Sequence, residues 1–458
     1  MKKFFGDKKF YKMLLVILLP ILLQQFITQF VNMIDNIMVG RVGNDEMIGV
    51  SLANQLLFVL MLGIFGAMSG ASIFGSQFFG AQDKEGYQES FRFKWLIGLI
   101  LIAIGCAILF PLSDELIGAF IKGVEGEYSN GERVLEVGKE YLYIMIIGFL
   151  PFLIKEIYAS SLREQRETLF PMICGVVAIF TNLVLDWAMI FGHLGFKEMG
   201  VIGAAWATVI ARVVEMLMIV LYTHFRIRKY VFLQGVYKKL YVSFKNIRKF
   251  LAKTFPLMGN EILWSIGMTL VVNCLSIRGL DVIGAINIRN TVTNVFIVTG
   301  NSVGAASGII LGNLIGAGKS EEAHATSYKL ISSAILISLV LTLFEFLLSY
   351  VIPEIFNTSE EIIASAERLI RASSILLPIF VFNTTCYFIL RCGGKMLLTF
   401  GFDAMYIWAV RIPIAFILAK YTNIDIVLLC LCVEGADILK TFVGYILVDK
   451  GIWLRKLV

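Results

Sequence analysis

Charged residues are scarce in this chain, and their scarcity excludes most classes of soluble protein. Only 16% of the 458 residues are charged, whereas 58% are hydrophobic and the mean hydropathy is +0.81. A globular surface could not be covered with polar groups from this composition, so the surroundings of the chain must be largely lipid. The composition therefore predicts an integral membrane protein whose main contact is the lipid bilayer.

Residues and motifs typical of enzyme sites are also few. The chain has three histidines, and each lies in or near a polar joint between apolar runs. No HExxH or GxxxxGK[ST] motif occurs, and no group of Cys and His has the spacing of metal ligands. The seven cysteines lie in or beside apolar runs, which argues against a disulfide framework. We expect neither an enzyme nor a protein with a cofactor or a resident metal.

Long apolar runs, by contrast, are abundant. Because a helix of about 20 mostly apolar residues spans a bilayer, we predict an all-α fold of twelve transmembrane helices. Their approximate ranges are 13–38, 47–78, 91–111, 137–158, 168–190, 200–224, 251–277, 283–315, 328–352, 371–390, 397–419 and 425–448. The first run follows a basic segment, but it is too long for a signal peptide and has no small-residue cleavage site, so it is predicted to be a retained helix.

The basic residues are distributed unevenly between the two sides of the predicted membrane. With the N-terminus placed in the cytoplasm, 27 of the 40 Lys and Arg residues fall on the inner side, 9 on the outer side and 4 within helices. Since cytoplasmic loops carry the excess of positive charge, both termini are predicted to be cytoplasmic, in the plasma membrane of a bacterium. The net charge of +6 then reflects topology and contact with anionic lipid, and it does not indicate a nucleic-acid partner.

An internal repeat organises the chain. The stretch GAMSGASIFGSQFFGAQ at 66–82 is similar to GAASGIILGNLIGAGK at 304–319, and Pro20 in LLPILLQQF matches Pro256 in TFPLMGNEI. A third pair matches SSLREQRET with FILRCGGKM. We therefore predict two pseudo-symmetric lobes of six helices, related as parallel repeats, over 1–225 and 251–458, with a basic cytoplasmic linker at 226–250. The glycines at 300, 304, 308, 312 and 316 share one helix face and would permit close packing.

Ionisable residues inside the apolar runs are the candidates for function, because each costs about 2.5–3.5 kcal/mol at a helix centre. They are Asp35, Asp186, Arg212, Glu215, Glu261, Arg289, Glu345, Asp403, Arg411, Glu434, Asp437 and Lys440. Structural roles are expected for several of them. Arg212 and Glu215 stand close enough in sequence to pair on one helix face, as do Asp437 and Lys440.

Asp35 and Asp186 have no basic residue one helical turn away, so they need another explanation. Asn182 lies one helical turn before Asp186 on the same helix face, where an amide oxygen and a carboxylate can converge. Oxygen ligands suit a hard cation such as Na⁺, and the same carboxylates can bind a proton. The alternative is that these are unrelated polar residues that face the interior of the helix bundle.

Several short motifs in order resemble those of the MATE (multidrug and toxic compound extrusion) family. The first helix and loop carry P-x14-D-x4-GR-x-G, formed by Pro20, Asp35, Gly40, Arg41 and Gly43. The other motifs are FFGA, LIGAG, LREQRET, N-x3-D and GAAWAT at 203–208. The resemblance covers almost the whole chain, and it implies a secondary transporter of twelve helices in two lobes.

The resemblance also implies particular site residues. Matching the family motifs residue by residue gives an ion-coupling site for H⁺ or Na⁺ at Asp35, Asn182, Asp186 and Thr208. A second family site uses a glutamate of the seventh helix and an aspartate of the tenth. Here Glu261 stands closer to its proline than in that pattern, and the run 371–390 has no acid, so Glu261 is only a candidate secondary site.

These observations together predict a cation-coupled antiporter that acts as a monomer by alternating access, with a bend of the first helix at Pro20. By resemblance it would export amphipathic organic cations and drugs, which suit a cavity rich in Phe, Met and Tyr. The alternative function is a flippase for a lipid-linked headgroup or polysaccharide precursor, a relative in the same superfamily. Val271 and Val410 stand opposite Asp35 and Asn182 in the repeat, which favours ion coupling in the first lobe alone.

Overall fold

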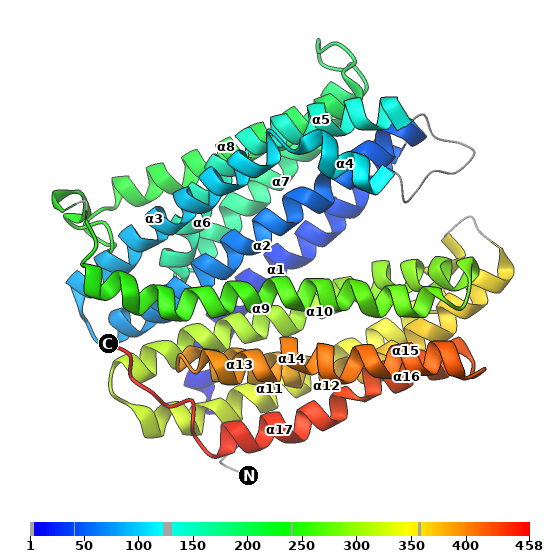
Figure 1. Cartoon of the computed structure of the whole chain (residues 1–458). Coiled ribbons are helices and arrows are strands. Elements are labelled where there is room, and N and C mark those ends of the chain that lie inside the picture. The colour runs from blue at the N-terminus through cyan, green and yellow to red at the C-terminus, as the bar shows by residue number, and fades with distance from the viewer. Residues whose placement is uncertain (1–3, 41, 122–130, 240, 356–358) are drawn as a thin grey trace. The chain divides into compact units, whose positions relative to one another are not determined.

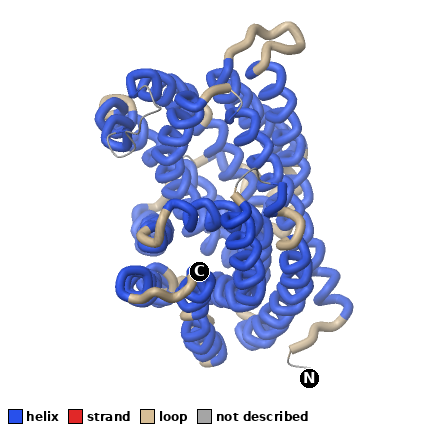
Figure 2. The backbone as a smooth tube through the Cα atoms, turned by 90° about the vertical axis from the view of Figure 1, so that its right-hand side faces the viewer, coloured by secondary structure: helices blue, strands red, loops and turns tan. Residues whose placement is uncertain are grey.

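The computed structural model describes residues 4–40, 42–121, 131–239, 241–355 and 359–458, and every regular element in them is helical (Figure 2). The first half contains α1 (Lys8–Gly40), α2 (Asn44–Gly80), α3 (Lys84–Leu109), α4 (Ser113–Ile121), α5 (Gly131–Ile147), α6 (Phe149–Glu164), α7 (Leu169–Ile190), α8 (Gly200–Phe225) and η1 (Val236–Lys238). The second half contains α9 (Phe244–Ser276), α10 (Leu280–Gly316), α11 (Ser320–Leu348), η2 (Pro353–Ile355), α12 (Glu360–Cys392), α13 (Met396–Phe402), α14 (Ala404–Tyr406), η3 (Ile407–Arg411), α15 (Ile412–Tyr421), α16 (Ile426–Gly435) and α17 (Asp437–Asp449) (Figure 1).

The predicted membrane helices are present. Ten helical segments of the described chain are long and apolar enough to cross a membrane, or eleven if α5 and α6, bent by 40°, count as one span. The twelfth predicted run, 425–448, is covered by α16 and α17, which are separated only by Ala436. The predicted all-α membrane fold is therefore confirmed.

The outer surface of these helices is apolar, as lipid contact requires. On α11, six large hydrophobic side chains at helical spacing are each about half exposed: Leu336, Leu339, Val340, Leu343, Phe344 and Leu347. The opposite face of α11 buries small and polar residues, among them Ser338 and Glu345. In water this pattern would be inverted, so α11 turns its apolar face to lipid and its polar face to protein.

The helix boundaries repeat with the period that the sequence predicts. The first three helices of the halves begin at Lys8 and Phe244, at Asn44 and Leu280, and at Lys84 and Ser320, so equivalent helices start at one constant offset. The same offset separates Pro20 from Pro256, and both prolines lie within the continuous helices α1 and α9. The sequence repeat is thus a repeat of structural elements.

Besides run 425–448, two predicted spans are interrupted, and a proline lies close to each of these breaks. Run 137–158 is divided at Gly148, because Pro151 has no N–H to bond the carbonyl of Ile147. Run 397–419 consists of α13, α14, η3 and α15, which follow one another along one line in Figure 1. Its short π-helical segment immediately precedes α15, whose second residue is Pro413.

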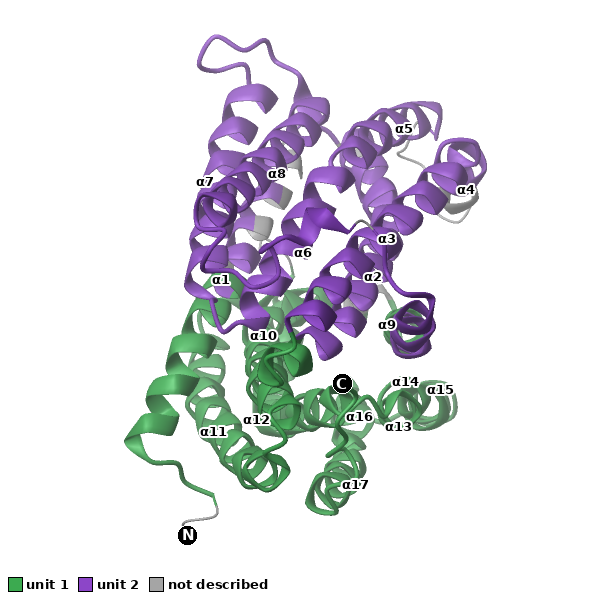
Figure 3. Ribbon diagram, turned by 90° about the vertical axis from the view of Figure 1, so that its left-hand side faces the viewer, with its two compact units in different colours: residues 1–25, 76–83, 259–458 green, residues 26–75, 84–258 purple. Residues whose placement is uncertain are grey.

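Contacts divide the chain into two compact units (Figure 3). Unit 1 contains Met1–Gln25, Ser76–Asp83 and Gly259–Val458, and unit 2 contains Phe26–Gly75 and Lys84–Met258. Helix α1 thus contributes its first part to unit 1 and its second part, with Asp35, to unit 2. The predicted lobes, 1–225 and 251–458, stay a prediction.

The predicted basic linker is folded onto unit 2. Gln88 Nε2 of α3 donates to the backbone carbonyl of Gln234 at 2.7 Å, and Arg92 Nε donates to that of Val236 at 3.1 Å. Phe232 is fully buried. At the exposed edge, Lys239 donates to Glu85 at 2.5 Å, and this hydrogen bond raises the pKa of the Lys239 ammonium group. The segment is therefore a docked part of the fold.

The glycine face of α10 packs closely in unit 1, as predicted for most of its members. A Cβ atom at Gly316 would lie 1.9 Å from the carbonyl oxygen of Gln77, and one at Gly304 would lie 2.2 Å from the ring of Phe388. Gly308 is the exception, since no atom of its described surroundings lies within 4 Å of its Cβ position. The face therefore contains positions where only glycine fits and one where a side chain is tolerated.

We expect Gly316→Ala to lower the free energy of unfolding by about 1–3 kcal/mol, because the added methyl group meets backbone that cannot turn aside. Gly308→Ala is the matched control on the same helix face. It should be neutral or stabilising by up to about 1 kcal/mol, because alanine favours a helix over glycine. Unfolding of both variants in detergent measures the difference, and equal stability would contradict the close approach at Gly316.

Candidate functional site

The two acids that the sequence singled out lie together in unit 2. Asp35 lies in the last part of α1 and Asp186 in α7, and their carboxyl groups interact directly. Asp186 is 3% exposed and Asp35 is partly buried. The Oδ1 atom of each is buried and makes no hydrogen bond within the described residues. Two acids that lie far apart in the sequence therefore form one polar centre among apolar helices.

The amide and hydroxyl groups predicted to accompany them are also in place. Asn182 lies one turn before Asp186 on α7 and interacts with its carboxyl group. Asn182 Nδ2 also donates to Thr208 Oγ1 of α8 at 3.4 Å. The four predicted residues thus form a continuous chain, Asp35 to Asp186 to Asn182 to Thr208, across three helices. Carboxyl, amide and hydroxyl oxygens are ligands that fit a hard cation, and the carboxyl pair equally fits a proton.

The sequence did not indicate a role for Tyr141, and it predicted Glu215 as the partner of Arg212 and not Tyr141. Tyr141 of α5 is 6% exposed, interacts electrostatically with both acids and is hydrogen-bonded to Asn54 of α2. A tyrosine within an apolar run carries no charge, so nothing in its spacing indicated a role. Arg212 stands one turn after Thr208, and its guanidinium group acts on Tyr141. Tyr141 is therefore acted on by both acids and by one positive charge.

Arg212 packs against the bend between α5 and α6. The guanidinium carbon lies 5.5 Å from the ring centroid of Phe149 and 5.4 Å from that of Phe152. A Cβ atom at Gly148 would lie 3.1 Å from Arg212 Nη1. The glycine at the bend and the two rings that follow it therefore make room for this charge and stabilise it by cation–π contact.

Two ion pairs suggested by the sequence are wrong. Glu215 lies 3.7 Å from Lys155 rather than pairing with Arg212 of its own helix. Asp437 lies 3.9 Å from Arg411, and Lys440 lies 2.9 Å from Asp403. In both cases the acid pairs with a residue of a neighbouring helix, because tertiary packing brings that residue closer than the basic residue one turn away on the same helix.

Glu261, the candidate secondary site, has a basic partner in unit 1. Tyr387 Oη donates to Glu261 Oε1 at 2.9 Å, and Arg391 Nη1 lies 3.5 Å from the same oxygen. The neighbouring Asn260 donates to Tyr387 and to Asp403, and its Oδ1 accepts the backbone N–H of Ala404 at the break between α13 and α14. Glu261 therefore belongs to a charge-balanced network that holds α9 to α12 and α14.

Because Glu261 pairs with Arg391, we expect Glu261→Gln to lower the free energy of unfolding and to leave the ion dependence of efflux unchanged. The variant leaves the buried Arg391 without its anion, which should cost about 1–3 kcal/mol in detergent unfolding. The ion concentration that gives half-maximal efflux should stay unchanged, and Tyr387→Phe should behave in the same way. A clear shift of that concentration in Glu261→Gln alone would identify Glu261 as an ion ligand after all.

Two other predicted features can be located only in part. Pro20 lies inside α1, which continues as a helix from Lys8 to Gly40, so the proline does not end the helix. The predicted bend there stays a prediction. Arg41 of the first motif lies outside the described residues, whereas Gly43 is described and directly precedes α2.

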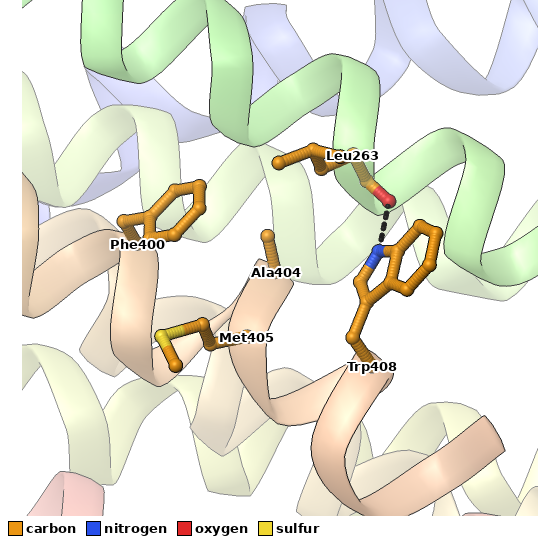
Figure 4. A pocket seen from close by; sticks show the side chains of 5 residues that line it. All are labelled: Leu263, Phe400, Ala404, Met405 and Trp408. Carbon is orange, nitrogen blue, oxygen red and sulfur yellow. Dashed lines mark hydrogen bonds between the residues drawn. The ribbon is translucent and has the colours of Figure 1, made fainter. Parts of the chain in front are cut away.

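A small apolar pocket occurs in unit 1, separate from the acidic residues of unit 2 (Figure 4). It has a volume of about 140 Å³ and is lined by Leu263, Phe400, Ala404, Met405 and Trp408. Figure 4 shows the hydrogen bond by which Trp408 Nε1 donates to the carbonyl oxygen of Leu263 at 3.0 Å. The lining can contact a flat apolar group, and it contains no ionisable side chain.

The fold and the polar centre define a class of protein: a helical membrane protein built from two repeats, with acidic residues buried among its spanning helices. The sequence profile of the MatE family matches residues 20–188 and 256–419. The chain therefore belongs to the MatE family, and the predicted membership is confirmed. The two matched ranges begin at Pro20 and Pro256, the equivalent prolines of the repeat.

Known proteins similar to this chain support the same assignment. The probable multidrug resistance protein NorM of Thermotoga maritima is 26% identical over 415 residues, or 91% of this chain and 87% of that protein. The probable multidrug resistance protein YoeA of Bacillus subtilis is 26% identical over 394 residues, or 85% and 82%. A solved structure described as the outward-facing conformation of a multidrug resistance MATE family transporter of the MOP superfamily matches with a TM-score of 0.84 at 20% identity, over 98% of each chain. The fold is thus that of this transporter.

Proposed function

We propose that this protein is a cation-coupled antiporter that exports amphipathic organic cations and drugs from the cell. The observation that carries the proposal is the convergence of Asp35, Asp186, Asn182 and Thr208 on one buried centre. The names of the relatives, which describe multidrug resistance, support the substrate class. The apolar pocket lined by Phe400, Met405 and Trp408 has the chemistry that a flat hydrophobic substrate needs.

The coupling ion acts at the acid pair. Two neighbouring carboxyl groups repel each other when both are ionised, so the pair of Asp35 and Asp186 is suited to hold one proton. Loss of that proton, or its replacement by Na⁺ among the same oxygens, changes the charge of the centre and its action on the neighbouring Tyr141. The pair therefore has two charge states that the surrounding helices must accommodate in different ways.

In this proposal, helix α1 couples the change in charge at Asp35 to the exchange between the outward-open and inward-open states. Asp35 follows Pro20 on this continuous helix, and the two residues belong to different compact units. Pro20 removes one backbone hydrogen bond, which makes bending easiest there. A charge change at Asp35 would re-pack α1 around Pro20 and favour the exchange between outward-open and inward-open states.

The energy of the ion gradient is sufficient for export. Each positive charge that moves inward contributes about 2.3 kcal/mol per 100 mV of membrane potential, and about 1.4 kcal/mol corresponds to a tenfold concentration ratio. The proposed location is the bacterial cell membrane with both termini in the cytoplasm, as the excess of basic residues on that side favours. The protein would act as a monomer, and it needs no cofactor besides the coupling ion.

Reconstitution tests the proposal. Purified protein in liposomes should move a fluorescent organic cation only when an ion gradient is imposed, and liposomes without protein should not. A headgroup-labelled lipid in the same vesicles should not change leaflets. Movement of that lipid without movement of the cation would instead indicate the flippase function, and no movement of either would contradict a transporter.

A further inference from the structure

A second buried carboxyl group lies in unit 1, away from every residue used above. Glu345 of α11 is fully buried on the face opposite the lipid-facing leucines. Thr293 Oγ1 of α10 donates to Glu345 Oε1 at 2.8 Å, while Glu345 Oε2 is buried and makes no hydrogen bond within the described residues. Among these residues the acid therefore has one hydroxyl partner and no directly paired cation.

The cation nearest in the fold is committed to another acid. Arg289 stands one turn before Thr293 on the same face of α10, and its Nη2 donates to Glu434 Oε1 of α16. Arg289 Nε is buried and makes no hydrogen bond to the described residues. Both Arg289 and Glu434 act electrostatically on Glu345. One guanidinium group thus faces two carboxyl groups, so the cluster is neutral only when one carboxyl group is protonated.

The charged residues of the surrounding helices that lie nearest in the fold have partners of their own. At the end of α11, Arg371 of α12 pairs with Glu367 and contacts Ser349. Other pairs on these helices and their neighbours are Arg368 with Asp425, Arg391 with Glu261 and Arg411 with Asp437, and the acids Glu360 and Glu361 lie in the first turn of α12. The other ionisable residues of α11 lie in its first three turns: Glu321, Glu322, His324 and Lys329.

We propose that Glu345 is a second proton-binding site of this protein, with Arg289 as the group that controls it. While Arg289 pairs with Glu434, Glu345 is the neutral acid, with its proton on the unpaired oxygen Oε2. When Arg289 turns to Glu345, the proton leaves Oε2 for Glu434, which is then the neutral acid, and the cluster stays uncharged. Leu348 ends α11 one turn after Glu345.

Infrared spectroscopy of the full-length protein in liposomes tests this at neutral pH. The spectrum of the wild type minus that of Glu345→Gln should contain the C=O stretching band of one protonated carboxylic acid, and this band should shift in D₂O. Thr293→Val should keep the band and move it to higher frequency, because the hydroxyl donor is removed. A difference spectrum with only the bands of an ionised carboxylate would overturn the proposal.

Two further variants test the role of Arg289. Glu434→Gln frees the guanidinium group to pair with Glu345, so the same band should be lost, whereas the matched variant Glu367→Gln should keep it. Retention of the band in Glu434→Gln would show that Arg289 does not control Glu345. Because the measurement needs neither substrate nor gradient, and Asp35 and Asp186 cancel in the difference, its result is independent of the proposed transport function.

Discussion

Asp35→Asn is expected to reduce ion-driven efflux at least a hundredfold, to the level of vesicles without the protein. Asparagine keeps the size of the side chain and can still bond to Asp186, but it can neither bind nor release a proton, and it removes one of the two negative charges. Any charge change would then be confined to Asp186 on α7, and α1 would lose the signal to re-pack. Efflux of a fluorescent cation from vesicles under a fixed gradient measures the effect.

Asp83→Asn is the matched control for that experiment. Asp83 lies exposed in the joint between α2 and α3, so the same chemical change should leave efflux within about twofold of the wild type. Full, ion-dependent efflux by Asp35→Asn would remove the acid pair from the mechanism. A loss that appeared equally in both variants would point to a general effect of the lost charge.

Lys94→Met is expected to lower the free energy of unfolding strongly, which is the second large effect. The Nζ atom of Lys94 in α3 is fully buried and donates to Glu164 at 2.7 Å and to the hydroxyl groups of Ser160 and Ser161 at 2.9 Å each. Removing the lysine leaves the buried acid without its cationic partner, which typically costs about 3–5 kcal/mol. Unfolding in detergent should therefore occur at a clearly lower temperature than in the wild type.

The double variant Lys94→Met/Glu164→Gln separates charge from packing. Because a buried pair can be replaced by neutral groups at little cost, the second change should restore most of the lost stability. The difference between the single and double variants measures the coupling between the two residues. If the double variant were less stable than Lys94→Met alone, the pair would not be the source of the effect.

How much the sequence could predict differs between the fold and the site. The apolar runs and the repeat determined the helices, because a membrane leaves helices as the simplest way to satisfy the backbone. The common offset between Lys8 and Phe244 and between Asn44 and Leu280 shows how closely helix boundaries follow the sequence repeat. Breaks such as the one at Gly148 were missed because a run of apolar residues looks the same in a straight and in a bent helix.

The charged residues of the candidate site could be predicted from the sequence, because a charge inside an apolar run is easily recognised. Asp35 and Asp186 stood out because acids are costly in apolar runs, and N-x3-D added Asn182 through helical spacing. Tyr141 could not be found in this way, because an uncharged tyrosine is ordinary in a membrane helix. The partners of Glu215 and Asp437 were mistaken for a related reason: helical spacing reports neighbours on one helix, whereas these acids pair with residues of other helices.

The central claim is that an ion gradient, acting at Asp35, drives export. The most direct measurement is efflux of a fluorescent cation from liposomes with the Na⁺ gradient and the pH gradient varied independently, for the wild type and for Asp35→Asn. We predict that collapsing one of the two gradients stops efflux by the wild type, and that Asp35→Asn responds to neither. Wild-type efflux that continues when both gradients are collapsed would contradict the account.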